Sequence, residues 1–560
     1  MEKRSPVSTD VLIIGGGSAA CMAAIEAAKF GVRVTLVDKG LMGRSGSSPT
    51  ADMAMSAAFG HTSLEGDLGK DSIEQHYEDT MRRGEWLNDP ALVAIMVREA
   101  LPLLEELETF GVRFSRTAEG LLFQYRTLGH TYARCCSPIG GGHKTLEMMR
   151  KEVLHRRVEV RENIFITRIL LRGGEVCGAY GMDIESGEER VFHCKSAVIA
   201  TGGATRLYPY TSASFHTTGD GFLLGLEAGA ELANMEFVEF TVIPKVGLRI
   251  ISSSGITPFM GRGSMLFNAH GERFLTRWDP EQLERTTRAV LARAIYKEWL
   301  EGRGPVYNDT SRFTPEIWDE FEMSQGQALH KLRAAGIEPR RERFEWVPAA
   351  HTFLGGIVID GRAGTGVPGL FASGETTDGF HGANRLSDNA ISECLVFGKR
   401  SGRFAAKHAK GREAPEIPPS ELGAERERLH GQFSDAGEDP RQIEKHIRNI
   451  SWRTIGVVRN GKDLDEGVSA FQEAQRTPLR VRGTAELLVA LEARHIARVG
   501  EIAARAALRR EESRGQHFRE DFPEKREDWR RILTVRAGSG GLIFGERPVP
   551  ESSGYEAAAL

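Results

Sequence analysis

The stretch Val11-Leu12-Ile13-Ile14-Gly15-Gly16-Gly17-Ser18-Ala19-Ala20 decides how this chain begins to fold, because it joins an apolar run to a glycine-rich turn. The four apolar residues predict a buried parallel strand. The glycines let the backbone approach a pyrophosphate, and the helix that follows directs its positive end at that group. A second apolar run, residues 34–37, ends at Asp38, where an acid roughly 20 residues after the turn can hydrogen-bond a ribose hydroxyl. The unit predicts a dinucleotide site; a glycine-rich turn in an ordinary α/β unit is the alternative.

Length and charge limit the possible classes of protein. With 560 residues the chain is too long for one core, so we expect three or four lobes. Its 73 basic and 77 acidic residues leave a net charge of −4, which predicts no nucleic-acid partner. Residues 1–5 run into the first strand without an apolar signal segment, and no run reaches the roughly 18 apolar residues of a membrane span. We therefore expect a cytoplasmic protein without direct membrane insertion, which a partner protein could make peripheral to a membrane.

The six cysteines form no C-x-x-C motif, so we expect no bound metal in this chain. Six thiols in a chain of this length fit a reducing cytoplasm. The adjacent pair Cys135-Cys136 is either two ordinary thiols or a redox-active pair.

Periodicity outlines the rest of the chain. Residues 88–110 and 142–156 have helical spacing of apolar residues, and residues 420–510 are charged and helix-periodic. Residues 158–160, 165–171 and 176–180 have the texture of short strands. A proline-rich linker at 414–419 marks a domain boundary, and the glycine- and proline-rich end after residue 536 predicts an extended or mobile tail.

Two further glycine-containing turns follow apolar strands. Residues 197–199 lead into Ala200-Thr201-Gly202-Gly203, and a later strand leads into Ala372-Ser373-Gly374-Glu375. The second ends in an acid that suits a ribose. Three such elements far apart in the sequence predict one large cofactor held by a discontinuous domain, which fits FAD better than a nicotinamide cofactor.

Several longer motifs make a specific resemblance. The chain resembles the flavoprotein subunit of the fumarate reductase/succinate dehydrogenase family, which also includes L-aspartate oxidase. The resemblance spans about residues 10–535 and rests on AVIATGGA (197–204), TGDG (218–221), MEFV (235–238), AHTFLGG (350–356), HGANRL (381–386) and ESRGQHFREDFP (512–523).

The resemblance implies an α/β fold: a discontinuous Rossmann-like FAD-binding domain with an inserted α+β capping domain and a C-terminal helical domain. We expect the FAD-binding domain at residues 1–240 and 350–410, the capping domain at 241–349, the helical domain at 420–535 and a tail at 536–560. The residues expected to bind FAD are Gly15, Gly17, Ser18, Ala19, Asp38, Lys39, Ser45, Gly46, Thr201, Gly202, Asp220, Glu375, Arg385, Asn389 and Ile391.

Chemistry at a C–C bond beside a carboxylate needs a hydride carrier, a cation on the carboxylate and a positioned acid or base. Arg385 and His351 match the family residues that bind one substrate carboxylate, and arginine can make two parallel hydrogen bonds to that group. The resemblance assigns the proton transfer to Arg288, with Arg285, one turn earlier, as the competing candidate. The implied reaction moves a hydride between FAD and such a bond.

One departure from the family concerns the attachment of FAD. Respiratory members bind it covalently through a histidine after an Arg-Ser pair, whereas Gly46 follows Arg44-Ser45 here. We therefore expect non-covalent FAD. Because the covalent link in the family helps to raise the flavin potential, its absence favours the reducing direction or a different substrate.

A second departure concerns the far end of the substrate. The family has His-Pro-Thr and later Thr-Glu-Gly to grip the second carboxylate, whereas this chain has residues 239–244, EFTVIP, and residues 255–259, GITPF. With Thr241, Ile256 and Thr257 at these places, we expect a small carboxylic acid other than fumarate or succinate, with a less charged far end. If succinate nevertheless binds tightly, a cation such as Lys245 or Arg262 would supply the missing anchor.

The electrons need a second carrier, since no metal or haem motif is evident. The resemblance implies an iron–sulfur electron-transfer subunit, and the mixed charges of residues 509–531 fit either such docking or a solvated helix face. Two other enzymes stay open: an L-aspartate oxidase-like amine oxidation and a flavoprotein subunit like that of adenylylsulfate reductase. The remaining alternative is a non-enzymatic, FAD-bound electron carrier.

Overall fold

The computed structural model describes residues 6–58, 69–246, 249–250 and 257–551. Its centre is a parallel five-stranded sheet in the order β18-β10-β2-β3-β6, with strands Leu370–Ala372, Ser196–Ile199, Val11–Ile14, Val34–Val37 and Glu159–Arg161. Every residue of β2 is buried, as the apolar run predicts. The sheet gathers strands from both parts of the discontinuous domain.

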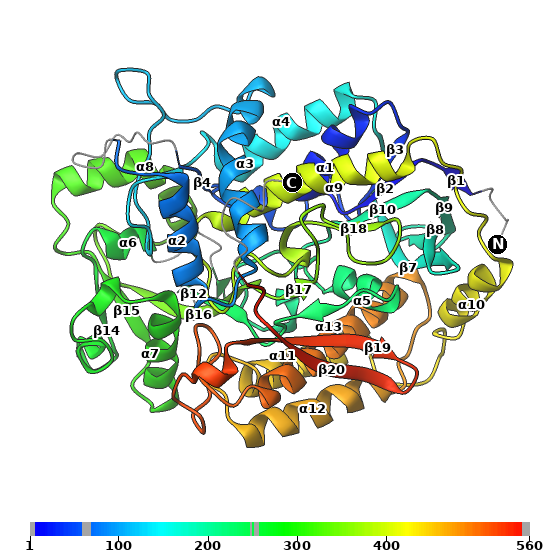
Figure 1. Cartoon of the computed structure of the whole chain (residues 1–560). Coiled ribbons are helices and arrows are strands. Elements are labelled where there is room, and N and C mark those ends of the chain that lie inside the picture. Colours follow the sequence, from blue (N-terminus) through cyan, green and yellow to red (C-terminus); the bar gives the residue numbers. More distant parts are fainter. Residues whose placement is uncertain (1–5, 59–68, 247–248, 251–256, 552–560) are drawn as a thin grey trace.

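Two helices cover this sheet and pack tightly against each other (Figure 1). Helix α1 (Ser18–Ala28) follows the glycine turn, and α9 (Asn389–Ala409) comes from the second part of the domain. Their contact depends on small residues, because a Cβ on Gly402 would lie 2.1 Å from the Ala23 carbonyl oxygen. The packing fixes the glycine turn of α1 beside the N-terminus of α9.

A second sheet, β1-β9-β8-β7, flanks the first and confirms the strands expected at 165–180. The helices expected at 88–110 and 142–156 are also present, as α3 and α4. The bounds of these elements and of their neighbours are β1 Val7–Ser8, β4 Met55–Ser56, α2 Ile73–Arg83, α3 Pro90–Thr109, β5 Cys135–Cys136, α4 Gly141–His155, β7 Ile164–Arg172, β8 Glu175–Asp183, β9 Glu189–His193 and α5 Asp220–Glu227.

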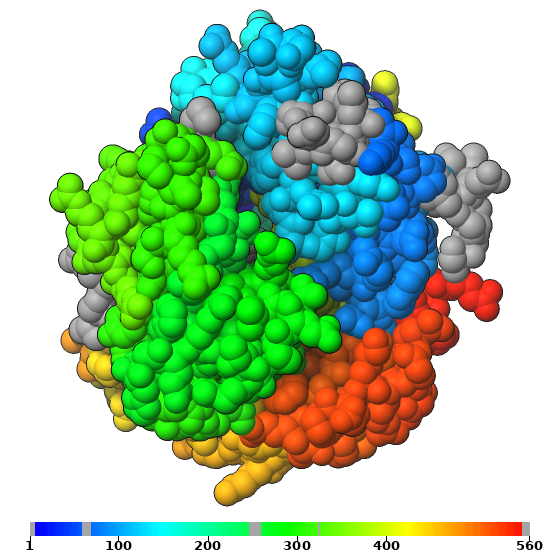
Figure 2. Space-filling view, turned by 90° about the vertical axis from the view of Figure 1, so that its left-hand side faces the viewer, coloured from blue at the N-terminus to red at the C-terminus, as the bar shows by residue number. Residues whose placement is uncertain are grey.

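The capping segment is an antiparallel sheet with helices beside it, drawn in green in Figures 1 and 2. Its long strands β12 and β16 pair with each other and leave the FAD-binding domain at one end. The α+β character expected of this insertion is confirmed. Its elements are β12 Val238–Val246, β13 Arg249–Ile250, α6 Thr257–Gly261, β14 Met265–Phe267, α7 Arg288–Leu300, β15 Val306–Asp309, α8 Pro315–Ala334 and β16 Phe344–Phe353.

The C-terminal part consists of helices α10 (Pro419–His430), α11 (Pro440–Thr454), α12 (Gly461–Arg476) and α13 (Thr484–Arg509), followed by a β-hairpin. The hairpin strands β19 (Arg531–Gly538) and β20 (Gly541–Pro548) join β11 (Leu232–Ala233) and β17 (Gly356–Ile357) in one sheet. Position 536, where the sequence predicts the start of an extended or mobile tail, lies inside β19. The glycines at 538 and 540–541 form the hairpin turn, and β11 holds the hairpin in place.

Candidate active site

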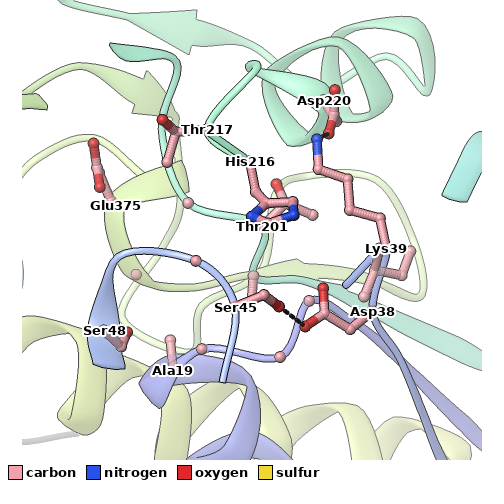
Figure 3. A pocket seen from close by; sticks show the side chains of 18 of the residues that line it. Ala19, Asp38, Lys39, Ser45, Ser48, Thr201, His216, Thr217, Asp220 and Glu375 are labelled. Carbon is pink, nitrogen blue, oxygen red and sulfur yellow. Dashed lines mark hydrogen bonds and ion pairs between the residues drawn. The ribbon is translucent and has the colours of Figure 1, made fainter. Parts of the chain in front are cut away.

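A cavity lies at the carboxyl ends of β2, β3 and β10 (Figure 3). This is the edge of a parallel sheet at which α/β proteins bind their ligands. Its lining includes twelve of the residues expected to bind FAD: Gly15, Gly17, Ser18, Ala19, Asp38, Lys39, Ser45, Gly46, Thr201, Gly202, Asp220 and Glu375. Arg385, Asn389 and Ile391 are not part of this lining.

The glycine turn leaves room for a ligand but none for side chains. Gly15 has a φ of +121°, and a Cβ there would lie 2.2 Å from the Ala200 carbonyl oxygen. A Cβ on Gly16 would lie 2.0 Å from Asp38 Oδ2. Helix α1 begins directly after the turn, so its backbone N–H groups face the cavity. These features fit the pyrophosphate and ribose of FAD.

Asp38 directly follows β3 and projects into the cavity, where Ser45 donates a hydrogen bond to Oδ2 at 3.2 Å (Figure 3). Burial raises the pKa of Asp38 and outweighs the hydrogen bonds from Gly40 and Ser45. The carboxylate oxygens of Asp38 can accept hydrogen bonds from ribose hydroxyls.

Lys39 and Asp220 bind each other across the cavity wall, with 2.7 Å between Nζ and Oδ2. Lys39 Nζ also contacts Glu492 Oε1 at 2.9 Å, and His495 Nδ1 lies 2.8 Å from Asp220 Oδ1. Although burial opposes it, the charge of Lys39 and the bond from His495 hold the pKa of Asp220 well below its usual range. Glu492 and His495 belong to α13, so this network ties the cavity wall to the C-terminal helices; sequence reasoning missed both residues.

Gly46, at the position where respiratory relatives are expected to carry a linking histidine, has a φ of +78° and open space around it. The lining of the cavity does contain His216, which the sequence analysis did not single out. Its signal is weak, because it lies in a loop before the TGDG motif and not within it.

Glu375 connects this cavity to a second cluster of side chains. Its Oε1 accepts a hydrogen bond from the Phe353 backbone N–H at 3.1 Å, and Phe353 lies two residues after His351 on β16. Burial and the charge of Glu393 raise the pKa of Glu375 to about 7, although hydrogen bonds from Thr352 and Phe353 oppose them.

The second cluster is built around Glu239. Arg288 Nη1 donates to Glu239 Oε1 at 2.9 Å, and Arg385 Nε donates to Glu239 Oε2 at 2.8 Å. Both Arg385 and Glu239 are buried. Although burial alone would raise it, the charges of Arg385 and Arg288 hold the pKa of Glu239 well below its usual range. The protein thus has its own carboxylate between the two arginines expected to act on substrate.

Local structure explains how Glu239 reaches the arginines. Glu239 pairs with Thr352 and Phe240 pairs with Ala350, so the register shifts here and His351 is the extra residue of a β-bulge in β16. Gln516 of the C-terminal segment binds at this point, since its Oε1 accepts the Phe240 N–H at 3.3 Å and its Nε2 donates to Asn384 Oδ1 at 3.1 Å. Gln516 therefore links the strand of Glu239 to the loop of Arg385.

The other predicted catalytic residues lie around the same carboxylate. Arg288 is the first residue of α7, where Thr287 caps the helix, and its Nη2 also donates to Ser387 Oγ at 3.2 Å. Arg285, the competing candidate, is exposed in the short turn before that helix. His351 lies on β16 with Nδ1 2.7 Å from Ser212 Oγ. Burial lowers the pKa of His351 to about 4, despite the opposing charge of Glu239, so its ring is neutral at neutral pH.

The residues expected at the far end of the substrate are only partly described. Ile256 and the side chain of Thr257 lie outside the described residues. Thr241 is buried on β12, opposite Ala349. The two cations expected as replacement anchors form ion pairs, Lys245 with Glu345 at 3.0 Å and Arg262 with Glu320 at 2.8 Å.

Asn389 and Ile391, both expected to bind FAD, lie in the first turn of α9. The Asn389 side chain makes its hydrogen bonds inside the protein, with Oδ1 2.8 Å from His76 Nε2 and Nδ2 donating to Thr80 at 2.9 Å. Cys135 and Cys136 are both buried free thiols, and burial raises the pKa of each.

Three of the seven arginines in residues 509–531 are internal, whereas Arg509, Arg526 and Arg530 are exposed. Arg510 and Arg514 are buried and both donate to Glu512, and Arg519 is buried against Asp521. Among the described residues there is no group of three or more histidine, cysteine or acidic side chains arranged to hold a metal ion. In the same part of the chain, no helix combines the length and apolarity that crossing a membrane requires.

Comparison with known proteins agrees with this geometry. The family "FAD binding domain" matches residues 10–391, and "Fumarate reductase flavoprotein C-term" matches residues 444–550. The chain belongs to the fumarate reductase/succinate dehydrogenase flavoprotein family. It is 37% identical over 541 residues to one of the subunits of the fumarate reductase (CoM/CoB) of Methanothermobacter marburgensis, covering 94% of this chain and 96% of that protein.

The family's solved structures share the whole fold. A quinol fumarate reductase flavoprotein of E. coli superimposes with a TM-score of 0.87 at 26% identity, over 98% of each chain. A Mycobacterium smegmatis Sdh1 structure gives a TM-score of 0.85 at 30% identity, over 98% of this chain and 95% of that one. The L-aspartate oxidase of Pseudomonas aeruginosa is 30% identical over 92% of this chain and 96% of its own length. The protein is accordingly an FAD-dependent oxidoreductase of the fumarate reductase type.

Proposed function

We propose that this chain is the flavoprotein subunit of an enzyme that reduces the C=C bond of a small unsaturated carboxylic acid. The observation that carries the proposal is the cluster of Arg288, Arg385 and His351 around Glu239, joined to the FAD cavity through Glu375. It supplies cations for a carboxylate beside a place for a hydride carrier.

Each residue has a defined task in the proposed reaction. Arg385 and His351 bind the substrate carboxylate and withdraw electron density from the adjacent C=C bond, which makes its far carbon a hydride acceptor. FAD held in the cavity would supply the hydride in its reduced form, after the electron-transfer partner has delivered two electrons to it. Arg288 then delivers a proton to the other carbon, so that the C=C bond becomes a CH–CH bond. Glu239 accepts hydrogen bonds from Arg288 and Arg385 and orients both.

Two observations support the reducing direction and non-covalent FAD. Gly46 has no side chain that could form a bond to FAD, and the Methanothermobacter marburgensis relative is named as a fumarate reductase. The name of that relative also describes it as one subunit of its enzyme, which supports an electron-transfer partner protein; we propose an iron–sulfur protein as that partner.

Anaerobic stopped-flow spectroscopy of the FAD-loaded chain tests the proposal. The protein is reduced with one equivalent of dithionite and mixed with fumarate, crotonate or buffer. We expect the absorbance band of oxidised flavin to return after mixing with an unsaturated acid and not after mixing with buffer. If no acid of the panel reoxidises the flavin, the proposal is wrong.

L-aspartate oxidase activity is the second candidate, because relatives of that name match over nearly the whole chain. It predicts that anaerobic L-aspartate bleaches the oxidised flavin. Bleaching by aspartate together with no reoxidation by crotonate would favour this alternative.

A further inference from the structure

Arg83, the last residue of α2, reaches the arginine cluster from a part of the chain that sequence reasoning did not consider. Its Nε atom is buried and has no hydrogen-bond partner within the residues that the structure describes. Buried polar groups are nearly always hydrogen-bonded, so this N–H group can still donate a hydrogen bond.

The neighbours of Arg83 show that its side chain lies beside the arginine cluster around Glu239. Gly129 marks the position, because a Cβ built on it would lie 3.5 Å from Arg83 Nε and 2.9 Å from Leu386 Cδ1. Leu386 follows Arg385 directly. Burial lowers the pKa of Arg83, and the positive charge of Arg288 lowers it further, while Glu239 acts in the opposite direction. Arg83 is therefore within electrostatic range of both Arg288 and Glu239.

The carboxylates near Arg83 already have partners. Glu239 accepts hydrogen bonds from Arg288 and Arg385, one on each oxygen. Glu85, two residues after Arg83, forms an ion pair with Lys525 at 3.0 Å. Arg83 is partly desolvated and lies near the like charge of Arg288. An anionic group of a bound ligand would therefore stabilise its charge.

We propose that Arg83 binds the second carboxylate of a dicarboxylic acid substrate and so determines the charge that the far end of the substrate must carry. The inference rests on the proposed function, which assigns the first carboxylate to Arg385 and His351. In Figure 2 a groove separates the green capping segment from the blue segment that contains α2, and a ligand entering this groove would meet both sides.

This assignment reverses one expectation from the sequence. The sequence predicts weak binding of fumarate and succinate because residues 241 and 255–257 lack the family's anchors for the second carboxylate. Lys245 and Arg262 are the cations considered as replacement anchors. Lys245 and Arg262 form their own ion pairs, whereas Arg83 lies next to the cluster. The distal anchor then comes from α2 and not from the capping domain.

Two substrates that differ only at the far end provide the test. Fumarate carries a second carboxylate where crotonate carries a methyl group. The FAD-loaded full chain is assayed anaerobically with reduced viologen, comparing wild type with Arg83→Gln, Arg83→Lys and the control Arg82→Gln. Arg82 is the exposed neighbour on the same helix and pairs with Asp79. Flavin content and thermal unfolding are measured for every variant.

In Arg83→Gln we expect the KM for fumarate to rise about 10- to 100-fold, the usual effect of losing a hydrogen bond to a charged group. The KM for crotonate should stay within about threefold of wild type, which a general structural defect would not allow. Arg83→Lys should recover part of the fumarate affinity, and Arg82→Gln should resemble wild type.

Two results would overturn the inference, and they have different meanings. If both acids are reduced and Arg83→Gln leaves the fumarate-to-crotonate KM ratio unchanged, Arg83 does not bind the far end, while the proposed function stands. If the wild-type chain reduces neither acid, the proposed function fails and the assignment of Arg83 fails with it.

Discussion

Replacing Arg288 by lysine is the most direct test of proton transfer, because it keeps the positive charge and removes the guanidinium. Arg288 uses two nitrogens at once, Nη1 on Glu239 at 2.9 Å and Nη2 on Ser387 at 3.2 Å. An ammonium group is a single point on a flexible stem and cannot span two acceptors in one fixed orientation. The FAD cavity should be unaffected, since Arg288 is not part of its lining.

The expected loss is large. A positioned acid contributes about 10²- to 10⁴-fold to a rate, which corresponds to about 3–5 kcal/mol of transition-state stabilisation. We expect kcat with fumarate to fall at least about a hundredfold in Arg288→Lys, with KM changing less than about tenfold and the flavin absorbance spectrum unchanged. The assay follows anaerobic oxidation of reduced viologen.

Arg285→Lys is the matched control, since Arg285 lies three residues earlier and is exposed. Its kcat should stay within about twofold of wild type, as expected for a surface substitution. Retention of a tenth or more of the activity in Arg288→Lys would refute the reasoning. Loss of activity in Arg285→Lys instead would show that the role belongs one turn earlier.

The remaining predictions concern the cofactor, the carboxylate and pH. Acid precipitation should release all flavin as free FAD, because Gly46 cannot link it; yellow colour in the washed pellet would contradict this. Arg385→Ala should raise the KM for fumarate and crotonate alike, since it removes the cation for the shared carboxylate, and an effect on fumarate alone would be unexpected. Folding favours neutral His351, whose pKa falls from about 6.5 to about 4, so its contribution to stability is complete above pH 6.5 and is lost as pH falls toward 4, by up to about 3 kcal/mol. The difference in urea midpoint between wild type and His351→Gln should therefore shrink over that range, and a constant difference would exclude this linkage.

The parts of the fold that sequence predicted best depend on local patterns. The apolar run before Gly15, the glycine turn and the helix after it lie within twenty residues, so their structure follows from burial and backbone freedom. The C-terminal hairpin shows the opposite case. Its glycines are typical of a mobile segment, and the strand that orders them, β11, lies far earlier in the chain. No local pattern reports such a pairing.

The same distinction applies to the candidate site. Motifs identify Arg288, His351 and Arg385, and the structure gathers all three around one point. Glu239 lies at the centre of these three residues. In the sequence it is noticed only because it belongs to the segment, residues 239–244, that differs from the family's His-Pro-Thr motif. Its role depends on a β-bulge and on Gln516, neither of which can be inferred from neighbouring residues. Arg83 escapes sequence reasoning for a similar reason, because helix α2 carries no motif.

Glu239 and Arg83 together explain how this site can differ from its family without losing affinity for an anion. A buried carboxylate between Arg288 and Arg385 lowers the attraction of both arginines for a substrate, which by itself would disfavour a dicarboxylic acid. Arg83, a half-buried arginine beside them, restores the positive charge. Glu239 then fixes the orientation of two guanidinium groups. Arg83 provides the positive charge that Glu239 neutralises. The two losses should therefore change substrate binding in opposite directions. Loss of Arg83 should weaken the binding of fumarate. Loss of the Glu239 charge should strengthen that binding, while Arg288 is held less well in its orientation.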